Sequence, residues 1–223
     1  GSWWFLPNLR VLVKDWRDRN APSMAPGSDV HTAEREKAWY IEEAQHFKDV
    51  MTPEERARYD ALDDTVKQYF TEGAIFPSVL ECAIKYPGRY SRLPRMSRME
   101  IWRRTEVMAA MFKRIERLAD MNGSRTMAMV MPEGAFVNRP AMKDWTRLGF
   151  VITPDMFGDK TCATMIENAA RKAGIVVVDM TTAFEAHGDE EGLFFKYDNH
   201  MTPAGNALLA KRFFPELEKE IPK

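Results

Sequence analysis

Residues 126–131, Thr-Met-Ala-Met-Val-Met, decide the fold class of this chain, because they form a continuous apolar run between two stop signals. Asn122 and Gly123 end the helical pattern that precedes the run, and Pro132 follows it. Six residues are too few for a helix here, so the run predicts a buried parallel strand. Residues 175–179, Ile-Val-Val-Val-Asp, come after Gly174 and predict a second strand of the same kind.

Helical patterns surround these two runs. Residues 99–121 predict a long amphipathic helix, residues 160–173 a second one, and residues 204–220 a closing helix that packs back on the sheet. In the first of them, five apolar side chains are expected to face a core: Trp102, Val107, Met111, Ile115 and Leu118. This alternation of helix and strand is typical of an open parallel sheet with right-handed crossovers, and therefore of an α/β fold.

The first 95 residues have a different character, and we expect them to form a mostly helical region. Residues 31–50 are charged and compatible with a helix, and Thr52-Pro53 is a start signal for a helix that is expected to reach about residue 70. A shorter helix is expected over 77–84. The region contains no catalytic grouping, so we divide the chain into 1–95, an insertion or cap, and 96–223, part of an α/β domain.

The long connection over residues 133–158 follows the carboxyl end of the first predicted strand. Loops at that end form the ligand crevice in open α/β sheets. Glu133, Asn138, Arg139 and Trp145 are therefore candidate cleft residues, and the alternative is an ordinary surface loop.

Near the end of the chain, an acid and a histidine lie two residues apart just before a helix start. Asp198 and His200 precede Thr202, which suits an N-cap, and Pro203, which suits the first helical position. Histidine exchanges protons near neutral pH, and a carboxylate on its second ring nitrogen fixes its tautomer. The pair is a candidate for the base and its orienting acid. The alternative is a surface acid with a histidine at a helix cap.

Residues 197–206, Tyr-Asp-Asn-His-Met-Thr-Pro-Ala-Gly-Asn, resemble the last conserved block of the SGNH (GDSL-like) hydrolases. The Thr-Pro-x-Gly that follows the histidine is similar to bacterial SGNH-like proteins and alginate-type O-acetyltransferase relatives. The resemblance covers about residues 100–214 and implies a flavodoxin-like three-layer sandwich. It further implies that Asp198 and His200 complete a catalytic triad. The nucleophilic Ser of that triad lies in a Gly-Asp-Ser block, and a Gly and an Asn from two other blocks form the oxyanion hole.

The Gly-Asp-Ser block is absent from this sequence, since Gly27-Ser28-Asp29 has another order and follows no predicted strand. Two strands also make an incomplete sheet. Either residues 1–95 contribute strands, or another chain completes the sheet, or this is the C-terminal portion of a longer protein. We favour the last alternative, with the missing blocks upstream.

The expected function is that of an SGNH-type serine esterase or O-acyl transferase, in which this chain supplies the Asp/His part of the triad. The substrate is then an acyl ester on a small molecule or a glycan. The alternative is a non-catalytic SGNH-like domain that acts as a binding or structural module. A third hypothesis uses His46, Asp49 and Glu54/Glu55 as a metal or acid/base site, although solvated helix faces explain these residues as well.

The composition of the chain limits the kinds of partner that we expect it to bind. A net charge of -1 gives no electrostatic case for nucleic acid, and four His and two Cys without ligand spacing predict neither a metal nor a cofactor. No apolar run is long enough for a membrane span. The location stays open, and it is extracytoplasmic if an upstream signal was removed. Residues 3–16 are rich in Trp, Phe and Leu and suit an amphipathic helix that packs on the domain or binds a membrane surface or protein partner.

Overall fold

The computed structural model describes residues 29–220, and it describes side chains from residue 34 onward. The chain divides into two compact units, residues 1–39 and residues 40–223. Helix α2 (Asp29–Val50) passes from the first unit into the second. All contacts reported below lie within the second unit. The division at residue 95 stays a prediction. The aromatic stretch 3–16 lies outside the described residues.

Three helices follow α2 in the N-terminal part of the second unit: α3 (Pro53–Asp60), α4 (Asp64–Thr71) and α5 (Pro77–Lys85). Helix α3 starts as predicted. The Thr52 hydroxyl accepts a hydrogen bond from the backbone N–H of Glu55 at 3.2 Å, and the Glu55 carboxylate accepts one from the N–H of Thr52 at 2.8 Å. This reciprocal pair satisfies two N–H groups that would otherwise lack partners.

The prediction of one helix from residue 53 to about residue 70 is wrong. The chain leaves the helix after Asp60, and Asp63 caps a new helix by accepting hydrogen bonds from the N–H groups of Thr65 at 2.9 Å and Val66 at 3.3 Å. An Asp side chain competes with the backbone for these donors, which favours a break over a continuous helix.

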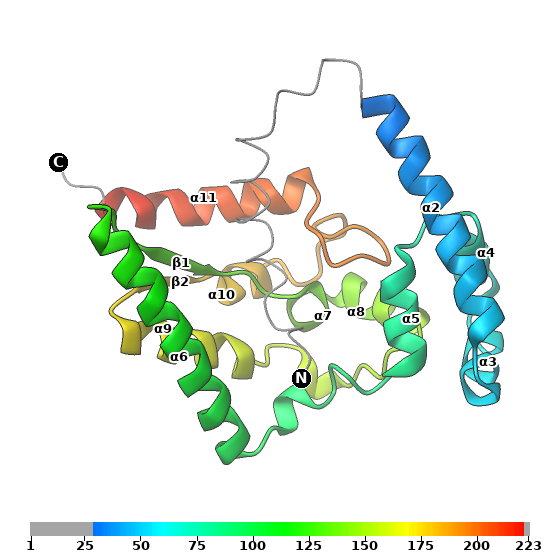
Figure 1. Ribbon diagram of the computed structural model, residues 1–223, viewed down its shortest axis with the longest axis horizontal. Helices are drawn as coiled ribbons and strands as arrows, with labels where there is room; N and C mark the ends of the chain where they lie inside the picture. The colour runs from blue at the N-terminus through cyan, green and yellow to red at the C-terminus, as the bar shows by residue number, and fades with distance from the viewer. Residues whose placement is uncertain (1–28, 221–223) are drawn as a thin grey trace. The chain divides into compact units, whose positions relative to one another are not determined.

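The second part of the unit alternates helices and two strands (Figure 1). After the short helix η1 (Leu93–Arg95), its elements are α6 (Arg98–Met121), β1 (Met127–Val130), α7 (Gly134–Val137), α8 (Arg139–Arg147), η2 (Pro154–Met156), α9 (Thr161–Ala173), β2 (Val176–Asp179), α10 (Thr181–Glu185) and α11 (Pro203–Glu220). Strands β1 and β2 are direct neighbours and run parallel, with Met127 opposite Val176 and Val130 opposite Asp179. The α/β class and both predicted strands are confirmed.

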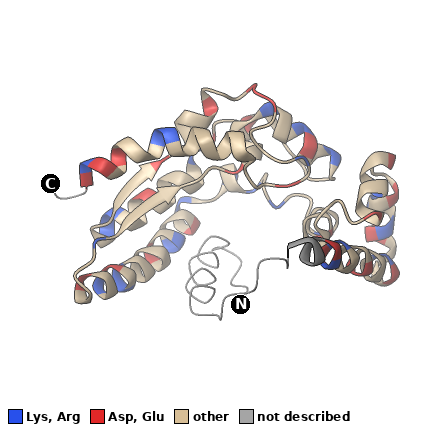
Figure 2. Ribbon diagram, turned by 90° about the horizontal axis from the view of Figure 1, so that it is seen from above, with Lys and Arg blue, Asp and Glu red and all other residues tan. Residues whose placement is uncertain are grey.

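Helices cover both sides of this small sheet. Helix α9 packs on both strands and α6 packs on α9, whereas α11 runs on the opposite side of the strands from α6 (Figures 1 and 2). The sheet has two strands in the described part of the chain, and residues 29–95 contribute helices but no strand there. The alternative that the N-terminal region completes the sheet therefore finds no support in the residues that can be seen.

Two expectations about burial need correction. On α6, Trp102, Val107 and Leu118 are more than half exposed, and the buried residues are the small Thr105 and Ala109. Helix α6 contacts α9 rather than the sheet, so small side chains mark its packed face. Within the strands only Val130 and Val178 are buried, although Ile175, the first residue of the second predicted run, is buried as well. Each strand pairs with a single neighbour among the described residues, which leaves more of it accessible.

Candidate functional site

The Asp198-Asn199-His200 turn forms the tip of a closed loop between α10 and α11. Phe194 and Met201 form an antiparallel bridge across the base of the loop, and the N–H of Phe195 donates to the carbonyl of His200 at 3.0 Å. The loop is thus a small hairpin. Its backbone bonds determine the spacing of the two candidate side chains.

The loop leads into α11 through the predicted cap. The Thr202 hydroxyl accepts a hydrogen bond from the N–H of Gly205 at 3.3 Å, and Pro203 is the first residue of the helix. The same hydroxyl donates to the carbonyl of Gly192 on the other side of the loop. The cap therefore joins the helix start to both ends of the hairpin.

Asp198 and His200 make the contact that the sequence predicts. The Asp198 oxygen Oδ1 lies 2.6 Å from Nδ1 of His200, and it also accepts a hydrogen bond from the His200 backbone N–H at 3.1 Å. When Nδ1–H donates to this carboxylate, Nε2 carries the lone pair and becomes the basic atom. The His200 side chain is 85% exposed and that of Asp198 36% exposed, so Nε2 is accessible to a reactant from outside the loop.

Tyr197, directly before the dyad, has the only positive φ among the non-glycine residues that the structure describes, at 57°. Its ring is buried, makes an edge contact with Tyr69 at 6.0 Å between ring centroids, and lies under the guanidinium of Arg147 at 5.4 Å. Burial of the ring raises the pKa of the Tyr197 hydroxyl. Packing holds a backbone conformation that costs free energy by itself.

Asn199, between the two residues of the dyad, ties the loop to the sheet. Its Oδ1 accepts a hydrogen bond of 2.8 Å from the backbone N–H of Gly134. Gly134 follows β1, so the dyad is attached at the carboxyl end of a parallel strand, where sites of open α/β sheets lie. Tyr197 and Asn199 belong to the 197–206 block, but the sequence predicts no role for either. The type of residue at Asn199 suits a side-chain-to-backbone bond, but its partner 65 positions away leaves no local signal.

Glu133, a candidate cleft residue, lies at the same end of β1. Its carboxylate oxygen Oε2 is buried and has no hydrogen-bond partner in the structure. Burial raises the pKa of this carboxyl from the ordinary value of 4.5 to about 7, while the Arg89 charge and a hydrogen bond from Tyr90 act in the opposite direction. Burial, and then the Glu133 charge, raises the pKa of the Cys162 thiol to about 11. Glu133 is thus a half-buried residue whose buried carboxyl has a pKa raised to about 7.

The other three candidate cleft residues have structural roles, and the structure does not bring them together in a cleft. Asn138 is buried and caps α8 by accepting from the N–H of Ala141 at 3.0 Å. Trp145 belongs to the core, with Tyr90 at 4.8 Å between ring centroids. Arg139 is exposed, pairs with Asp189 at 2.9 Å, and stacks on Phe157. Arg139 is thus a surface residue of α8, whereas Asn138 and Trp145 are buried, which neither the cleft nor the surface-loop interpretation predicted.

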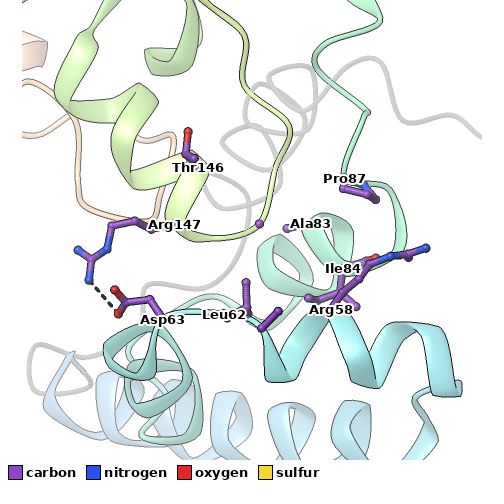
Figure 3. A pocket seen from close by; sticks show the side chains of 10 residues that line it. Arg58, Leu62, Asp63, Ala83, Ile84, Pro87, Thr146 and Arg147 are labelled. Atoms are coloured by element: carbon purple, nitrogen blue, oxygen red, sulfur yellow. Dashed lines mark hydrogen bonds and ion pairs between the residues drawn. The ribbon is translucent and has the colours of Figure 1, made fainter.

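A pocket of about 440 Å³ lies between the N-terminal helices and α8 (Figure 3). Its wall includes Leu62, Ile84 and the ion pair of Asp63 with Arg147 at 3.0 Å. Neither Asp198 nor His200 lines it. The same Arg147 covers the Tyr197 ring, so the pocket adjoins the residue that supports the dyad without reaching the dyad itself.

A second histidine–carboxylate pair, which no sequence motif predicts, lies in the same part of the chain. Nδ1 of His187 lies 2.6 Å from Oε1 of Glu190 in the polar turn after α10. The hypothesis of a site at His46, Asp49 and Glu54/Glu55 gains no support. Asp49 accepts from Gln45 at 2.7 Å along the surface of α2, and Glu55 belongs to the capping box of α3.

Within residues 29–220, no three His, Cys, Asp or Glu side chains gather in a way that suits a metal ion. Over the same range, no helix has the length and apolar character needed to cross a membrane.

Comparison with known protein families matches residues 101–223 to the family described as an SGNH hydrolase-like domain of the acetyltransferase AlgX. The match covers more than half of the chain and includes both strands and the Asp198/His200 loop. No curated protein and no solved structure gave a significant match.

Proposed function

Because this chain belongs to the family of SGNH hydrolase-like domains of the AlgX type, we propose that it is the acid/base part of an acyl-transfer enzyme. His200 is the general base and Asp198 its orienting carboxylate. The observation that carries this assignment is the 2.6 Å contact between Asp198 Oδ1 and His200 Nδ1, at a capped turn beside the carboxyl end of β1. It is the arrangement that a serine nucleophile requires of its partners.

In the proposed reaction, Nε2 of His200 takes the proton of a serine hydroxyl while that oxygen attacks the carbonyl carbon of an ester. The tetrahedral intermediate collapses, the ester C–O bond breaks, and the imidazolium returns the proton to the leaving alkoxide. Water or an acceptor hydroxyl then attacks the acyl-serine by the same proton path. Asp198 stabilises the imidazolium that exists between the two proton transfers.

We assign the nucleophile to a segment outside this chain, because none of its serines stands in a Gly-Asp-Ser block. Ser91 Oγ donates to the carbonyl of Gly88 at 3.2 Å, and Ser97 Oγ caps α6. Among the described residues, no hydrogen bond joins a serine hydroxyl to His200. Since His200 is highly exposed, its basic nitrogen is available to a serine that another segment brings to the loop.

An acetyl ester on a glycan or a small molecule is the substrate we favour, in keeping with the acetyltransferase in the family description. The exposure of His200 also suits a second function, a non-catalytic SGNH-like module in which the Asp-x-His turn is only a stable loop before a helix. The two functions differ in one respect that can be measured, namely whether a serine becomes nucleophilic in a manner that depends on His200.

The test uses the complete gene product, a fluorophosphonate probe and p-nitrophenyl acetate as acetyl donor. The proposal expects labelling of one serine and release of p-nitrophenol, with His200→Ala reducing kcat by about 10⁴-fold or more. His187→Ala is the matched control, since it removes an imidazole from a histidine–carboxylate pair of equal length and should leave the rate unchanged. Activity that survives His200→Ala would overturn the proposal. Absence of labelling and turnover would favour the non-catalytic module.

A further inference from the structure

The Asp198–His200 contact is too exposed to maintain its own geometry. Ion pairs and hydrogen bonds between exposed side chains contribute about 0–1 kcal/mol, because water competes for both partners. The His200 side chain is 85% exposed, so packing does not hold the ring. The orientation of the dyad must therefore come from the backbone of the turn and from whatever attaches that turn to the domain.

One side chain makes the hydrogen bond that attaches the tip of the turn to the domain, in addition to the packing of the buried Tyr197 ring. Most hydrogen bonds of residues 195–200 stay within the hairpin, as between Phe195 and His200 or between Asp198 and Phe195. Within the described part of the chain, a single hydrogen bond links these residues to anything outside 192–206, and it runs from the N–H of Gly134 to Oδ1 of Asn199.

We propose that Asn199 is a positioning residue for the dyad, because its carboxamide fixes the middle of the Asp198-Asn199-His200 step to the backbone of Gly134 at the end of β1. The inference rests on the proposed function only in treating His200 as a base. What Asn199 does to the imidazole, namely keep Nδ1 on the Asp198 carboxylate and Nε2 unprotonated, is a property of the folded chain and can be measured without turnover.

The chemistry of the contact explains why an acceptor is needed here. Gly134 is buried and is the first residue of α7, so its N–H has no partner within that helix. Loss of the Asn199 oxygen leaves this buried donor unsatisfied and removes the tie on the turn. An aspartate at 199 would still accept the hydrogen bond, whereas alanine or leucine would not. The side chain at 199 therefore acts through its oxygen.

The test compares the ring ¹⁵N chemical shifts of His200 in the folded chain and in variants at position 199. In the unmodified chain, we expect His200 to be mainly the Nδ1–H tautomer. Asn199→Ala and the nearly isosteric Asn199→Leu should reduce that population severalfold, and Asn199→Asp should restore it. His187 is an internal reference, because its own contact with Glu190 is untouched.

Asn206→Ala is the matched control, since Asn206 lies in the same segment and, among the described residues, its side chain bonds only to the nearby carbonyl of Met201, at 3.2 Å. It should leave the His200 tautomer unchanged. If Asn199→Ala fails to fold, Asn199→Leu carries the comparison, because it keeps the side-chain volume. Unchanged His200 shifts in folded Asn199→Leu would overturn the inference.

Kinetics of the complete gene product separate this inference from the proposed function. If the product is active, Asn199→Leu should lower kcat about 10- to 100-fold with little change in KM, as expected for a misplaced catalytic group, and Asn199→Asp should recover it. A tautomer change without any activity in the unmodified protein would sink the proposed function and leave the positioning role standing. If instead the unmodified protein is active and Asn199→Leu changes neither the His200 tautomer nor kcat, the proposed function stands and the positioning role is overturned.

Discussion

Gly205 in the first turn of α11 lies directly against the carbonyl oxygen of Leu193 at the base of the dyad loop. A Cβ atom at Gly205 would come closer than 3.0 Å to that backbone oxygen, which itself accepts a hydrogen bond from Thr202. Backbone on one side and a helix on the other leave no flexible group that could move aside. The Thr-Pro-x-Gly sequence therefore needs glycine at position 205, because any side chain there would collide with the Leu193 carbonyl.

Gly205→Ala should destabilise the chain, although alanine in place of glycine usually stabilises a helix by about 1 kcal/mol. Overpacking against a fixed carbonyl should instead cost about 1–3 kcal/mol. Urea unfolding monitored by circular dichroism would measure the difference. Lys211→Ala, at an exposed position of the same helix, should be nearly neutral. Unfolding midpoints that are equal for Gly205→Ala and the original chain would contradict the close approach.

Glu133 should make stability decrease as pH rises. Its pKa is about 7 in the folded chain and near the ordinary 4.5 when unfolded, so the folded state binds more protons between these values. The free energy of unfolding should therefore fall by about 3 kcal/mol as pH rises through this window. Glu133→Gln, which stays neutral, should remove this dependence. Thermal melts of both proteins at pH 5 and pH 8 provide the measurement, and parallel pH profiles would disprove the assignment.

Tyr197 should stabilise the loop through its ring and not through its hydroxyl, for which the structure shows no hydrogen-bond partner among the described residues. Tyr197→Ala should cost about 3 kcal/mol, as for other buried aromatic truncations. Tyr197→Phe keeps the contacts with Tyr69 and Arg147 and should cost less than about 1 kcal/mol. Chemical denaturation of the two variants tests this. An equal loss in both would assign the effect to the hydroxyl.

The 223-residue chain alone should not react with a fluorophosphonate at any serine. A serine becomes reactive when its hydroxyl contacts the base, and loss of the nucleophile in such enzymes costs about 10⁶-fold in turnover. No described serine makes that contact with His200. Intact-mass spectrometry after probe treatment gives the answer. Stoichiometric modification that His200→Ala abolishes would place the nucleophile within this chain.

Local signals in the sequence predicted local structure well. Thr52 and Pro53 at the start of α3, Gly174 at the end of α9, and Thr202 with Pro203 at the start of α11 all act within a few residues of the chain. The same holds for the Asp198–His200 contact, since two residues in one turn are close whatever surrounds them. Short apolar runs between stop signals likewise predicted the parallel strands β1 and β2.

Predictions of helix length and of burial failed where a residue can interact with more than one alternative partner. The pattern of apolar residues over 53–70 suits one helix, but the carboxylate of Asp63 offers the backbone a better alternative. Helix α6 has apolar residues on more than one face. The face that packs against α9 is the one that carries the small residues. The position of Trp145 after β1 predicts a cleft residue, but its ring packs against Tyr90 and Phe150 in the core.

By itself, the sequence determined the helix starts and the Asp198/His200 pair, because each depends on bonds between near neighbours in the chain. It also determined the α/β class and the positions of the two strands, because apolar runs between helical patterns are visible without knowing their partners. Only the tertiary structure decided that Gly134 anchors the dyad through Asn199, that Tyr197 adopts a positive φ under Arg147, and that the Glu133 carboxyl is buried with a pKa raised to about 7. These three features arise from groups tens of residues apart. Their free energies come from burial and from long-range contacts, which no local pattern of residues encodes.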